Sequence, residues 1–350
     1  MQKFFKHGPK SNNMVKWSSG GMDKVLLTRP ILEPGYSILR EKLDVVMPKG
    51  DPPSKEELLE LVKDVRGILC HLTERIDREI IENAPNLKAI STVSVGVDHI
   101  DVAEATKRGI IVTHTPEVLT ETTADLAWAL IMATARRVAE ADRFIRKRMW
   151  KGPWRIDFML GHDVYGATLG IIGLGRIGQA VVRRARGFRM KILYYDIVRR
   201  ETIERELNAE YTPLEELLKK SDIITIHVPL TPETFHLIDE EKLKKMKNTS
   251  ILVNTSRGKV VDGKALYKAL REGWIAGAGL DVFEEEPIPD DDPLLELENI
   301  VLTPHIASAS YATRRKMSEV AALNLIEALR GGTPMYVYNP EVIGKRRNCP

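Results

Sequence analysis

Short apolar runs alternate with amphipathic stretches through the first third of the chain. The runs predict strands at residues 24–30, 44–47, 67–72, 87–93 and 110–113. The stretches between them predict helices at 34–43, 54–63, 78–83 and 102–107, with Ser54 and Glu57 at the spacing of a capping box. Strands separated by short helices are typical of βαβ units. The pattern therefore predicts an α/β fold with a parallel sheet.

A second alternation of the same kind begins at Thr168. Strands are predicted at 169–172, 191–196, 223–228, 250–254, 276–282 and 299–302, with helices from 176 and at 202–207, 214–220, 240–246, 264–272 and 312–330. Thr120–Lys147 lies between the two alternations and predicts one long crossover helix. The wide apolar face of this helix fits either burial in a core or a subunit interface. Together the two alternations predict two doubly wound, Rossmann-like parallel sheets.

A glycine turn opens the second alternation. Gly173, Gly175 and Gly178 lie between an apolar strand and a helix, and Asp196 ends the next strand. This arrangement is typical of dinucleotide sites, where the glycines permit a tight turn and the helix N-terminus faces the pyrophosphate. Close packing of the helix on the strand, with no ligand, is the alternative. The motif predicts a class of cofactor and says nothing about the reaction.

Charge and cysteine content narrow the class of protein. The 52 basic and 49 acidic residues nearly cancel, which gives no reason to expect nucleic-acid or membrane binding. No apolar run is long enough to span a bilayer. Cys70 and Cys349 lack the neighbours of a zinc site and suit a reducing cytoplasm, so no metal is expected. Residues 1–21 are basic and rich in Gly, Ser and Asn, and we expect a disordered extension that need not belong to the native protein.

Three polar residues follow predicted strands of the second alternation. They are Arg257 in N-T-S-R-G, Glu286 in E-E-E-P and His305 in T-P-H. Arginine can bind a carboxylate in bidentate fashion, histidine exchanges protons near neutral pH, and a carboxylate beside histidine stabilises the imidazolium. Singly, each has a simpler interpretation: a loop-bracing arginine, a structural histidine, and a solvated glutamate in an acidic run. Their common position at strand ends after a dinucleotide motif favours hydride transfer to a 2-oxo acid.

Five segments carry a resemblance to a known family. From about Met22 to Ile343 the chain resembles the D-isomer-specific 2-hydroxyacid dehydrogenases, most closely their glyoxylate/hydroxypyruvate reductase branch, in GLGRIGQAV, HVPLTPET, NTSRGKVVD, GAGLDVFEEEP and LTPHIAS. The resemblance implies NAD(P)H-dependent, reversible reduction of glyoxylate and hydroxypyruvate in a homodimer. It also implies a cofactor domain (119–308) inserted in a discontinuous substrate domain (22–118 and 309–350).

The resemblance assigns roles to particular residues. Arg257 binds the substrate carboxylate and carbonyl, His305 donates the proton, and Glu286 is its partner. Val95 and Gly96 offer backbone N–H groups to the substrate, although a simple strand-to-helix turn capped by Asp98 or Asp101 would also explain that segment. The implied cofactor contacts are Leu174, Gly175, Arg176, Ile177, Asp196, Ile197, Val198, Thr255, Ser256, Arg257, Asp281, His305, Ile306 and Ala307.

The choice between NAD and NADP depends on Asp196. A carboxylate there accepts from the adenosine ribose 2′-OH and repels a 2′-phosphate, which favours NAD. Many reductases of this branch carry Ser or Gly with a following Arg at this place. The chain departs from them at Asp196 but has Arg199 and Arg200 close by, so NADP stays open.

Two rival functions remain from the sequence. One is another D-2-hydroxyacid dehydrogenase, such as phosphoglycerate dehydrogenase, although the chain ends soon after its last helix and leaves no room for a regulatory domain. The other is a non-catalytic, NAD-sensing binding protein like the co-repressors that share this fold. Retention of Arg257, Glu286 and His305 counts against a purely binding role. The sequence does not determine the physiological 2-oxo acid, the direction of the reaction in the cell or the size of the oligomer.

Overall fold

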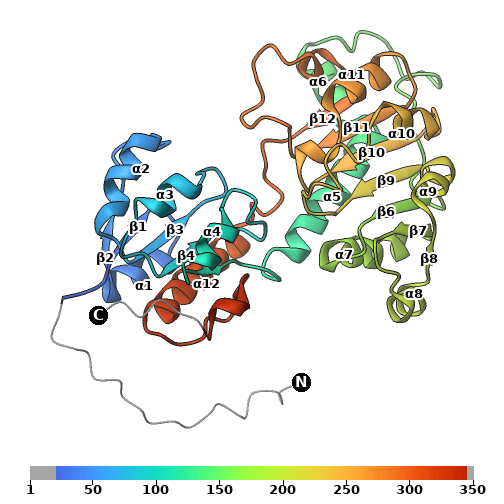
Figure 1. Ribbon diagram of the computed structural model, residues 1–350. Helices are drawn as coiled ribbons and strands as arrows, with labels where there is room; N and C mark the ends of the chain where they lie inside the picture. The colour runs from blue at the N-terminus through green and yellow to red at the C-terminus, as the bar shows by residue number, and fades with distance from the viewer. Residues whose placement is uncertain (1–20, 345–350) are drawn as a thin grey trace, which may run out of the picture.

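The structure is a computed structural model that describes residues 21–344. Two parallel sheets lie side by side, each with helices packed against it (Figure 1). The first has the strand order β2-β1-β3-β4-β5. Its strands are β1 (Lys24–Leu27), β2 (Asp44–Val46), β3 (Gly67–Cys70), β4 (Ala89–Thr92) and β5 (Ile111–Thr113). Residues 1–20, nearly all of the extension expected to be disordered, lie outside the described residues.

Helices cover both faces of the first sheet. Alternate residues of β1 face opposite cores, as the two-residue period of a strand requires. Val25 and Leu27 pack with α1 (Gly35–Lys42) and α12 (Tyr311–Leu329), whereas Leu26 packs with α2 (Lys55–Leu61), α3 (Arg78–Glu82) and α4 (Val102–Lys107). Helix α12 therefore returns from the end of the chain to the first sheet (Figure 1).

A close contact fixes α12 against α1. A Cβ on Gly35 would lie 2.5 Å from backbone atoms of Ser318, so only glycine lets the two helices approach this far. The Ser318 hydroxyl also accepts a hydrogen bond from the Leu32 N–H at 3.1 Å. The last helix is thus an integral part of the first core.

The second sheet has seven strands in the order β12-β11-β10-β9-β6-β7-β8. They are β6 (Thr168–Ile172), β7 (Lys191–Tyr195), β8 (Ala209–Tyr211), β9 (Ile223–Ile226), β10 (Ile251–Asn254), β11 (Gly277–Leu280) and β12 (Ile300–Leu302). One face packs against α5 (Thr120–Ala135), α7 (Arg176–Ala185) and α8 (Glu201–Leu207). The other packs against α9 (Leu214–Lys220), α10 (Glu240–Lys245) and α11 (Gly263–Arg271). Within each sheet, every pair of neighbouring strands is parallel, which confirms the predicted architecture.

The prediction of one helix over Thr120–Lys147 is wrong, because the structure breaks it into α5 and α6 (Val138–Arg146). Arg137 adopts a left-handed conformation with φ of +53° and ends α5. Its guanidinium donates two hydrogen bonds to Glu140 and one to the carbonyl of Leu160. These tertiary contacts stabilise a conformation that a non-glycine residue adopts only at a cost.

Two smaller expectations also need correction. The edge strand β8 is not among the predicted strands, because three residues are too few to show an alternating pattern. Only one of the two hydrogen bonds of the predicted capping box at Ser54 forms. The Ser54 hydroxyl accepts from the Glu57 N–H at 3.2 Å, but the Glu57 carboxylate turns to the N–H groups of Lys49 and Gly50.

Short 3₁₀ turns complete the described part of the chain, at Val62–Asp64, Arg186–Phe188, Gly258–Val260, Pro293–Glu296 and Pro340–Val342. Within residues 21–344, no helix combines the length and apolar character that crossing a membrane demands.

Candidate active site

The glycine turn joins β6 to α7 at the carboxyl edge of the second sheet. Gly173 has a φ of +95°, which favours glycine, and a Cβ on Gly178 would overlap the Gly173 carbonyl oxygen. A Cβ on Gly175 would meet open space, so the first turn of α7 is accessible from outside. The first N–H groups of a helix have no partner within it, so this accessible turn offers donors to a ligand. This is the geometry that an anionic group needs.

Asp196 lies beside this turn, directly after β7. Its carboxylate accepts from the N–H of Leu174 at 2.9 Å and from that of Val198 at 3.4 Å. The Leu174 N–H, which the resemblance placed at a pyrophosphate, is therefore directed at Asp196. Ile197 and Val198 are 89% and 56% exposed.

The two arginines after Asp196 differ in their partners. Arg199 donates to both carboxylate oxygens of Glu204, at 2.8 and 3.0 Å. Glu204 also accepts from the Tyr194 hydroxyl, and the hydrogen bonds from Arg199 and Tyr194 lower its pKa to about 2. Arg200 lies 3.7 Å from Asp196. Arg199 is thus held away from Asp196, whereas Arg200 lies next to it.

The turn after β10 is held by Asn254, which the sequence analysis did not single out. Its side-chain oxygen accepts from the N–H and the hydroxyl of Ser256, and its amide donates to the carbonyl of Arg257 at 2.9 Å. The Thr255 hydroxyl is buried without a hydrogen-bond partner. An unpartnered buried hydroxyl directly after β10, at the same edge of the sheet as the glycine turn, fits a polar ligand group such as a nicotinamide ribose or amide. The residues present therefore fit a nicotinamide dinucleotide.

Asp281 holds the loop that carries His305. Its carboxylate is fully buried and accepts from the Thr303 hydroxyl at 2.6 Å and from the N–H groups of Ile306 and Ala307, each at 2.8 Å. Burial raises the pKa of Asp281, although these hydrogen bonds oppose the shift. His305 has a φ of +52°, a strained conformation for a residue other than glycine. Asp281 thus fixes the backbone on both sides of a strained histidine.

His305 and Glu286 are in direct contact. The imidazole Nδ1 lies 2.6 Å from a Glu286 carboxylate oxygen, and the other oxygen accepts from the Phe283 N–H at 3.0 Å. Burial by itself would raise the pKa of Glu286, but the hydrogen bonds with His305 and the Phe283 N–H and the charges of His305 and Arg257 together outweigh it and lower the pKa. Glu284 instead pairs with His236 and the Gly263 N–H. Of the three consecutive glutamates, Glu286 is the one that reaches the histidine.

Arg257 contacts the first sheet domain through Asp98. Its Nε lies 3.0 and 3.2 Å from the two carboxylate oxygens, and its Nη2 lies 2.9 Å from one of them. Asp101, not Asp98, caps α4 by accepting from the Glu104 N–H. Gly96 lies under the guanidinium, since a Cβ there would come within 2.9 Å of Arg257 Cζ. Asp98 is the second residue of the site whose contact the sequence analysis did not foresee.

A cavity of about 370 Å³ brings these groups together between the two sheets. From the second sheet domain it is lined by Leu230, Arg257, Gly258, Lys259, Phe283, Glu284, Glu286 and His305, and from the first by Leu72, Thr73, Arg75, Asp98 and His99. The predicted residues Arg257, Glu286 and His305 therefore share one cavity. Among residues 21–344, no group of three or more His, Cys, Asp or Glu side chains is placed to hold a metal ion.

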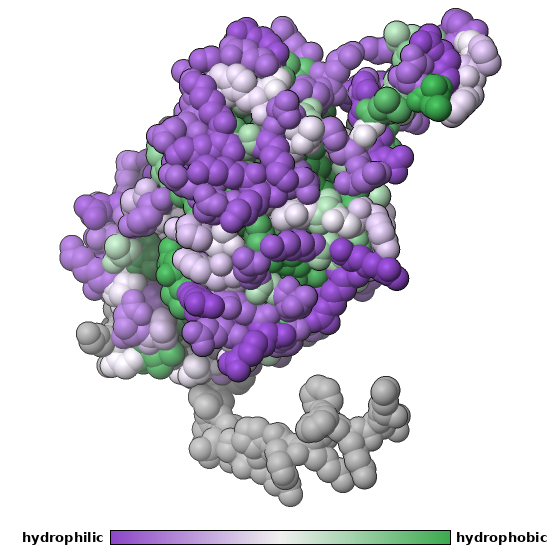
Figure 2. Space-filling view, turned by 90° about the vertical axis from the view of Figure 1, so that its right-hand side faces the viewer, coloured by the Kyte–Doolittle hydropathy of each residue, from purple (hydrophilic) through white to green (hydrophobic). Residues whose placement is uncertain are grey.

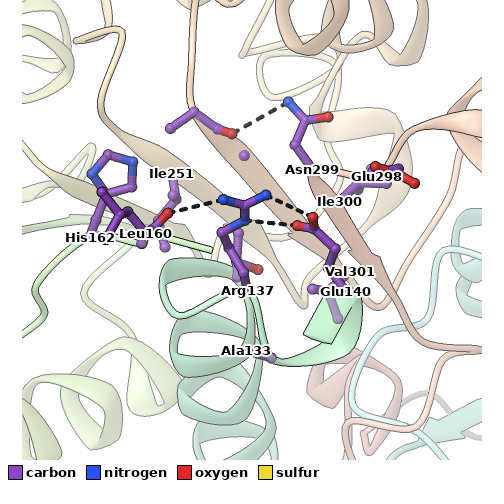
Figure 3. A pocket seen from close by; sticks show the side chains of 14 residues that line it. Ala133, Arg137, Glu140, Leu160, His162, Ile251, Glu298, Asn299, Ile300 and Val301 are labelled. Atoms are coloured by element: carbon purple, nitrogen blue, oxygen red, sulfur yellow. Dashed lines mark hydrogen bonds and ion pairs between the residues drawn. The ribbon is translucent and has the colours of Figure 1, made fainter. Parts of the chain in front are cut away.

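A second cavity, of about 260 Å³, lies at the opposite edge of the second sheet (Figure 3). Ile251, Gly277 and Ile300, at the amino ends of their strands, line it. Figure 3 shows the Arg137 guanidinium bridging Glu140 and Leu160 across it. None of the predicted site residues lines this cavity, so we assign the candidate chemistry to the cavity between the sheets.

Comparisons with known proteins show the family of the chain. The family model "D-isomer specific 2-hydroxyacid dehydrogenase, NAD binding domain" matches residues 128–307. A glyoxylate reductase of Korarchaeum cryptofilum is 60% identical over 324 residues, which cover 92% of this chain and 98% of the relative. A glyoxylate reductase of Pyrococcus horikoshii is 55% identical over 329 residues, 93% of this chain and 98% of that one.

Solved structures of the same architecture cover nearly the whole chain. A Thermus thermophilus protein has a TM-score of 0.83 at 45% identity, over 90% of this chain and 99% of its own. An NADPH-dependent glyoxylate/hydroxypyruvate reductase of Sinorhizobium meliloti, in complex with NADP and malonate, has a TM-score of 0.82 at 32% identity, over 94% and 100%. A D-lactate dehydrogenase of Aquifex aeolicus, complexed with NAD and lactic acid, has a TM-score of 0.78 at 33% identity, over 93% and 98%.

Proposed function

The chain belongs to the D-isomer-specific 2-hydroxyacid dehydrogenase family, and on that premise we propose that it is a glyoxylate reductase that also accepts hydroxypyruvate. The observation that carries the proposal is the single cavity in which Arg257, Glu286 and His305 meet. The names of the similar archaeal enzymes support glyoxylate as the substrate. As an oxidoreductase of this family, the protein uses a nicotinamide cofactor.

Each of the three residues has a distinct role in the proposed reaction. Arg257 binds the substrate carboxylate and polarises the carbonyl, because a fixed guanidinium stabilises the negative charge that develops on oxygen. Glu286 holds His305 through Nδ1, which leaves Nε2 to donate a proton to the carbonyl oxygen. A nicotinamide, when bound, supplies the hydride. The strained backbone of His305 and its Asp281 support limit the positions that the imidazole can take.

We propose that NAD is the preferred cofactor. Asp196 lies next to the glycine turn, where its carboxylate can accept from a ribose 2′-OH and repel a 2′-phosphate. Arg199, a candidate for a phosphate contact, is committed to Glu204. The turn residues Gly175, Arg176 and Ile177 would hold the pyrophosphate. Leu174, which is buried and donates its N–H to Asp196, would support the turn. Thr255, Ser256, Asp281, Ile306 and Ala307 would surround the nicotinamide.

The domain organisation follows the same proposal. Residues 119–308 would form the cofactor domain, supported by the match of the family model over 128–307. Residues 22–118 and 309–350 would form the substrate domain, supported by the packing of α12 on α1. The cavity between the sheets would then close on the substrate and exclude water. The two cysteines, of which Cys70 is a buried free thiol, favour a cytoplasmic location.

A homodimer is part of the proposal. Most of the described face in Figure 2 is hydrophilic, but a projecting lobe carries hydrophobic atoms. Between residues 138 and 165 the chain exposes large apolar side chains, with Trp154 and Ile156 each 79% exposed. Large apolar side chains exposed along one segment favour an interface. Sedimentation of the wild type against a double variant, Trp154→Lys with Ile156→Lys, should show a dimer that becomes a monomer.

One experiment tests the function against its rivals. Oxidation of NADH and of NADPH is followed with glyoxylate, hydroxypyruvate and phosphohydroxypyruvate as substrates. We expect the highest kcat/KM with NADH and one of the two smaller acids. A preference for phosphohydroxypyruvate would instead indicate a phosphoglycerate dehydrogenase. Tight NADH binding with no turnover of any 2-oxo acid would indicate a sensor.

A further inference from the structure

The guanidinium of Arg257 has few hydrogen-bond donors left for a substrate. It carries five N–H groups, in a fixed planar arrangement. Asp98 accepts from Nε–H and from one N–H of Nη2, and the Ser256 carbonyl accepts from one N–H of Nη1 at 2.8 Å. One N–H on Nη1 and one on Nη2 remain. A substrate carboxylate must therefore approach the end of the guanidinium, because Asp98 occupies its side.

We propose that Asp98 is a positioning residue that fixes the orientation of Arg257, so that its two remaining N–H groups are directed at the substrate carboxylate and the adjacent carbonyl. This inference rests on the proposed function for the identity of the substrate. Asp98 follows β4 of the first sheet and Arg257 follows β10 of the second. The ion pair therefore sets the angle of the guanidinium relative to the first domain, and not only to its own strand.

The segment that carries Asp98 is itself held in place. The Ser94 hydroxyl donates to the Gly96 carbonyl at 2.7 Å, and His114 Nδ1 donates to the Val95 carbonyl at 2.8 Å. The absence of a side chain at Gly96 lets the guanidinium lie against this backbone. The Asp98 side chain is 40% exposed and the Arg257 side chain is 26% exposed, so the pair is partly shielded from water. The backbone N–H groups expected to bind the substrate at Val95 and Gly96 would thus face the same carboxylate as the oriented arginine.

The charge around the pair permits a second carboxylate. Arg75, Arg257 and Lys259 line the cavity together with Asp98, Glu284 and Glu286, so three basic side chains balance the three acidic ones. The contrary interpretation is that Asp98 competes with the substrate for Arg257. In that case removal of Asp98 would free two donors and strengthen carboxylate binding. The two interpretations predict effects of opposite sign.

The test uses the full-length enzyme with NADH bound, and oxamate as a probe that carries one carboxylate and needs no turnover. In Asp98→Asn the amide oxygen can replace the carboxylate oxygen that accepts from both Nε–H and Nη2–H, but the negative charge is lost and the amide NH₂ takes the place of the second oxygen, which faces the Nε–H donor. Asp98→Ala removes all of them. We expect the dissociation constant for oxamate to rise about 10- to 100-fold in both variants, because the arginine loses its fixed direction. The dissociation constant for NADH should stay within about twofold of that of the wild type.

Glu284→Gln is the matched control. Glu284 lines the same cavity and carries the same charge, but it pairs with His236 and not with Arg257. The dissociation constant of this variant for oxamate should change by less than about threefold. A larger change would mean that the net charge of the cavity, and not the Asp98–Arg257 pair, explains the effect of Asp98→Asn. Unchanged or tighter binding of oxamate by Asp98→Asn would overturn the proposal. If Asp98→Ala fails to fold, the isosteric Asp98→Asn decides alone.

Steady-state kinetics separate this inference from the proposed function. In Asp98→Asn, kcat/KM for glyoxylate should fall mainly through a higher KM, since the lost ion pair orients the arginine that binds the substrate carboxylate. A wild type that binds oxamate in an Asp98-dependent way but reduces no 2-oxo acid would refute the function and leave the positioning role intact. A wild type that reduces glyoxylate with no loss in Asp98→Asn would refute the positioning role alone.

Discussion

Replacement of Gly96 by alanine should disable substrate binding while the fold persists. A Cβ at this position would lie 2.8 Å from an Asp98 carboxylate oxygen and 2.9 Å from Arg257 Cζ, with Nη2 closer still. Carbon atoms in contact prefer about 3.5 Å or more, so the guanidinium must move on the order of 1 Å. Displacement of a substrate-positioning group by about 1 Å can cost about 100-fold in rate, equivalent to about 2.7 kcal/mol. The atoms that must move end flexible side chains, so the cost to stability should be small.

The assay compares kcat/KM for glyoxylate with the dissociation constant of NADH and the melting temperature. We expect kcat/KM to fall about 100-fold and the other two to change little. Gly187→Ala is the matched control, because a Cβ on Gly187 meets no atom within 4 Å, and it should behave as the wild type. A Gly96→Ala enzyme within about threefold of the wild-type kcat/KM would refute the placement of Arg257 against this turn.

Three further outcomes are expected. His305→Ala should lower kcat by about 100-fold or more while NADH titration shows unchanged cofactor binding, because it removes the proton donor; near-normal turnover would contradict that role. The lowered pKa of Glu286 keeps its carboxylate ionised in the folded enzyme, so its support of His305 is complete above the ordinary carboxyl range and is lost as pH falls through the lowered pKa. In Glu286→Gln, kcat/KM should be about 10-fold lower at neutral pH, and a pH profile should lack that acid limb; an identical profile would argue against the pair. Asp196→Asn keeps an acceptor for Leu174 but removes the charge, so the NADPH-to-NADH ratio of kcat/KM should rise about 10-fold; no gain with NADPH would mean that another group discriminates.

The helix break at Arg137 illustrates the limit of local patterns. Residues 120–147 keep apolar positions near helical spacing across the break, so periodicity predicts one helix. The left-handed Arg137 depends on Glu140 and on the carbonyl of Leu160, and the latter lies 23 positions along the chain. No pattern within one helix contains that partner. Asn254 was missed for a different reason: its partners Ser256 and Arg257 are close in sequence, but its role is to hold a turn and not to contact a ligand.

The sequence by itself determined the two parallel sheets, the glycine turn and the strand ends that carry Arg257, Glu286 and His305. Each of these follows from local periodicity, from the backbone freedom of glycine, or from the rule that ligands of open α/β sheets bind beyond strand ends. The tertiary structure decided which groups pair. Asp98 and Arg257 are 159 positions apart, and their ion pair forms only because the carboxyl edges of two separate sheets face one cavity. A contact of this kind depends on how the two sheets are oriented, which no single stretch of sequence encodes.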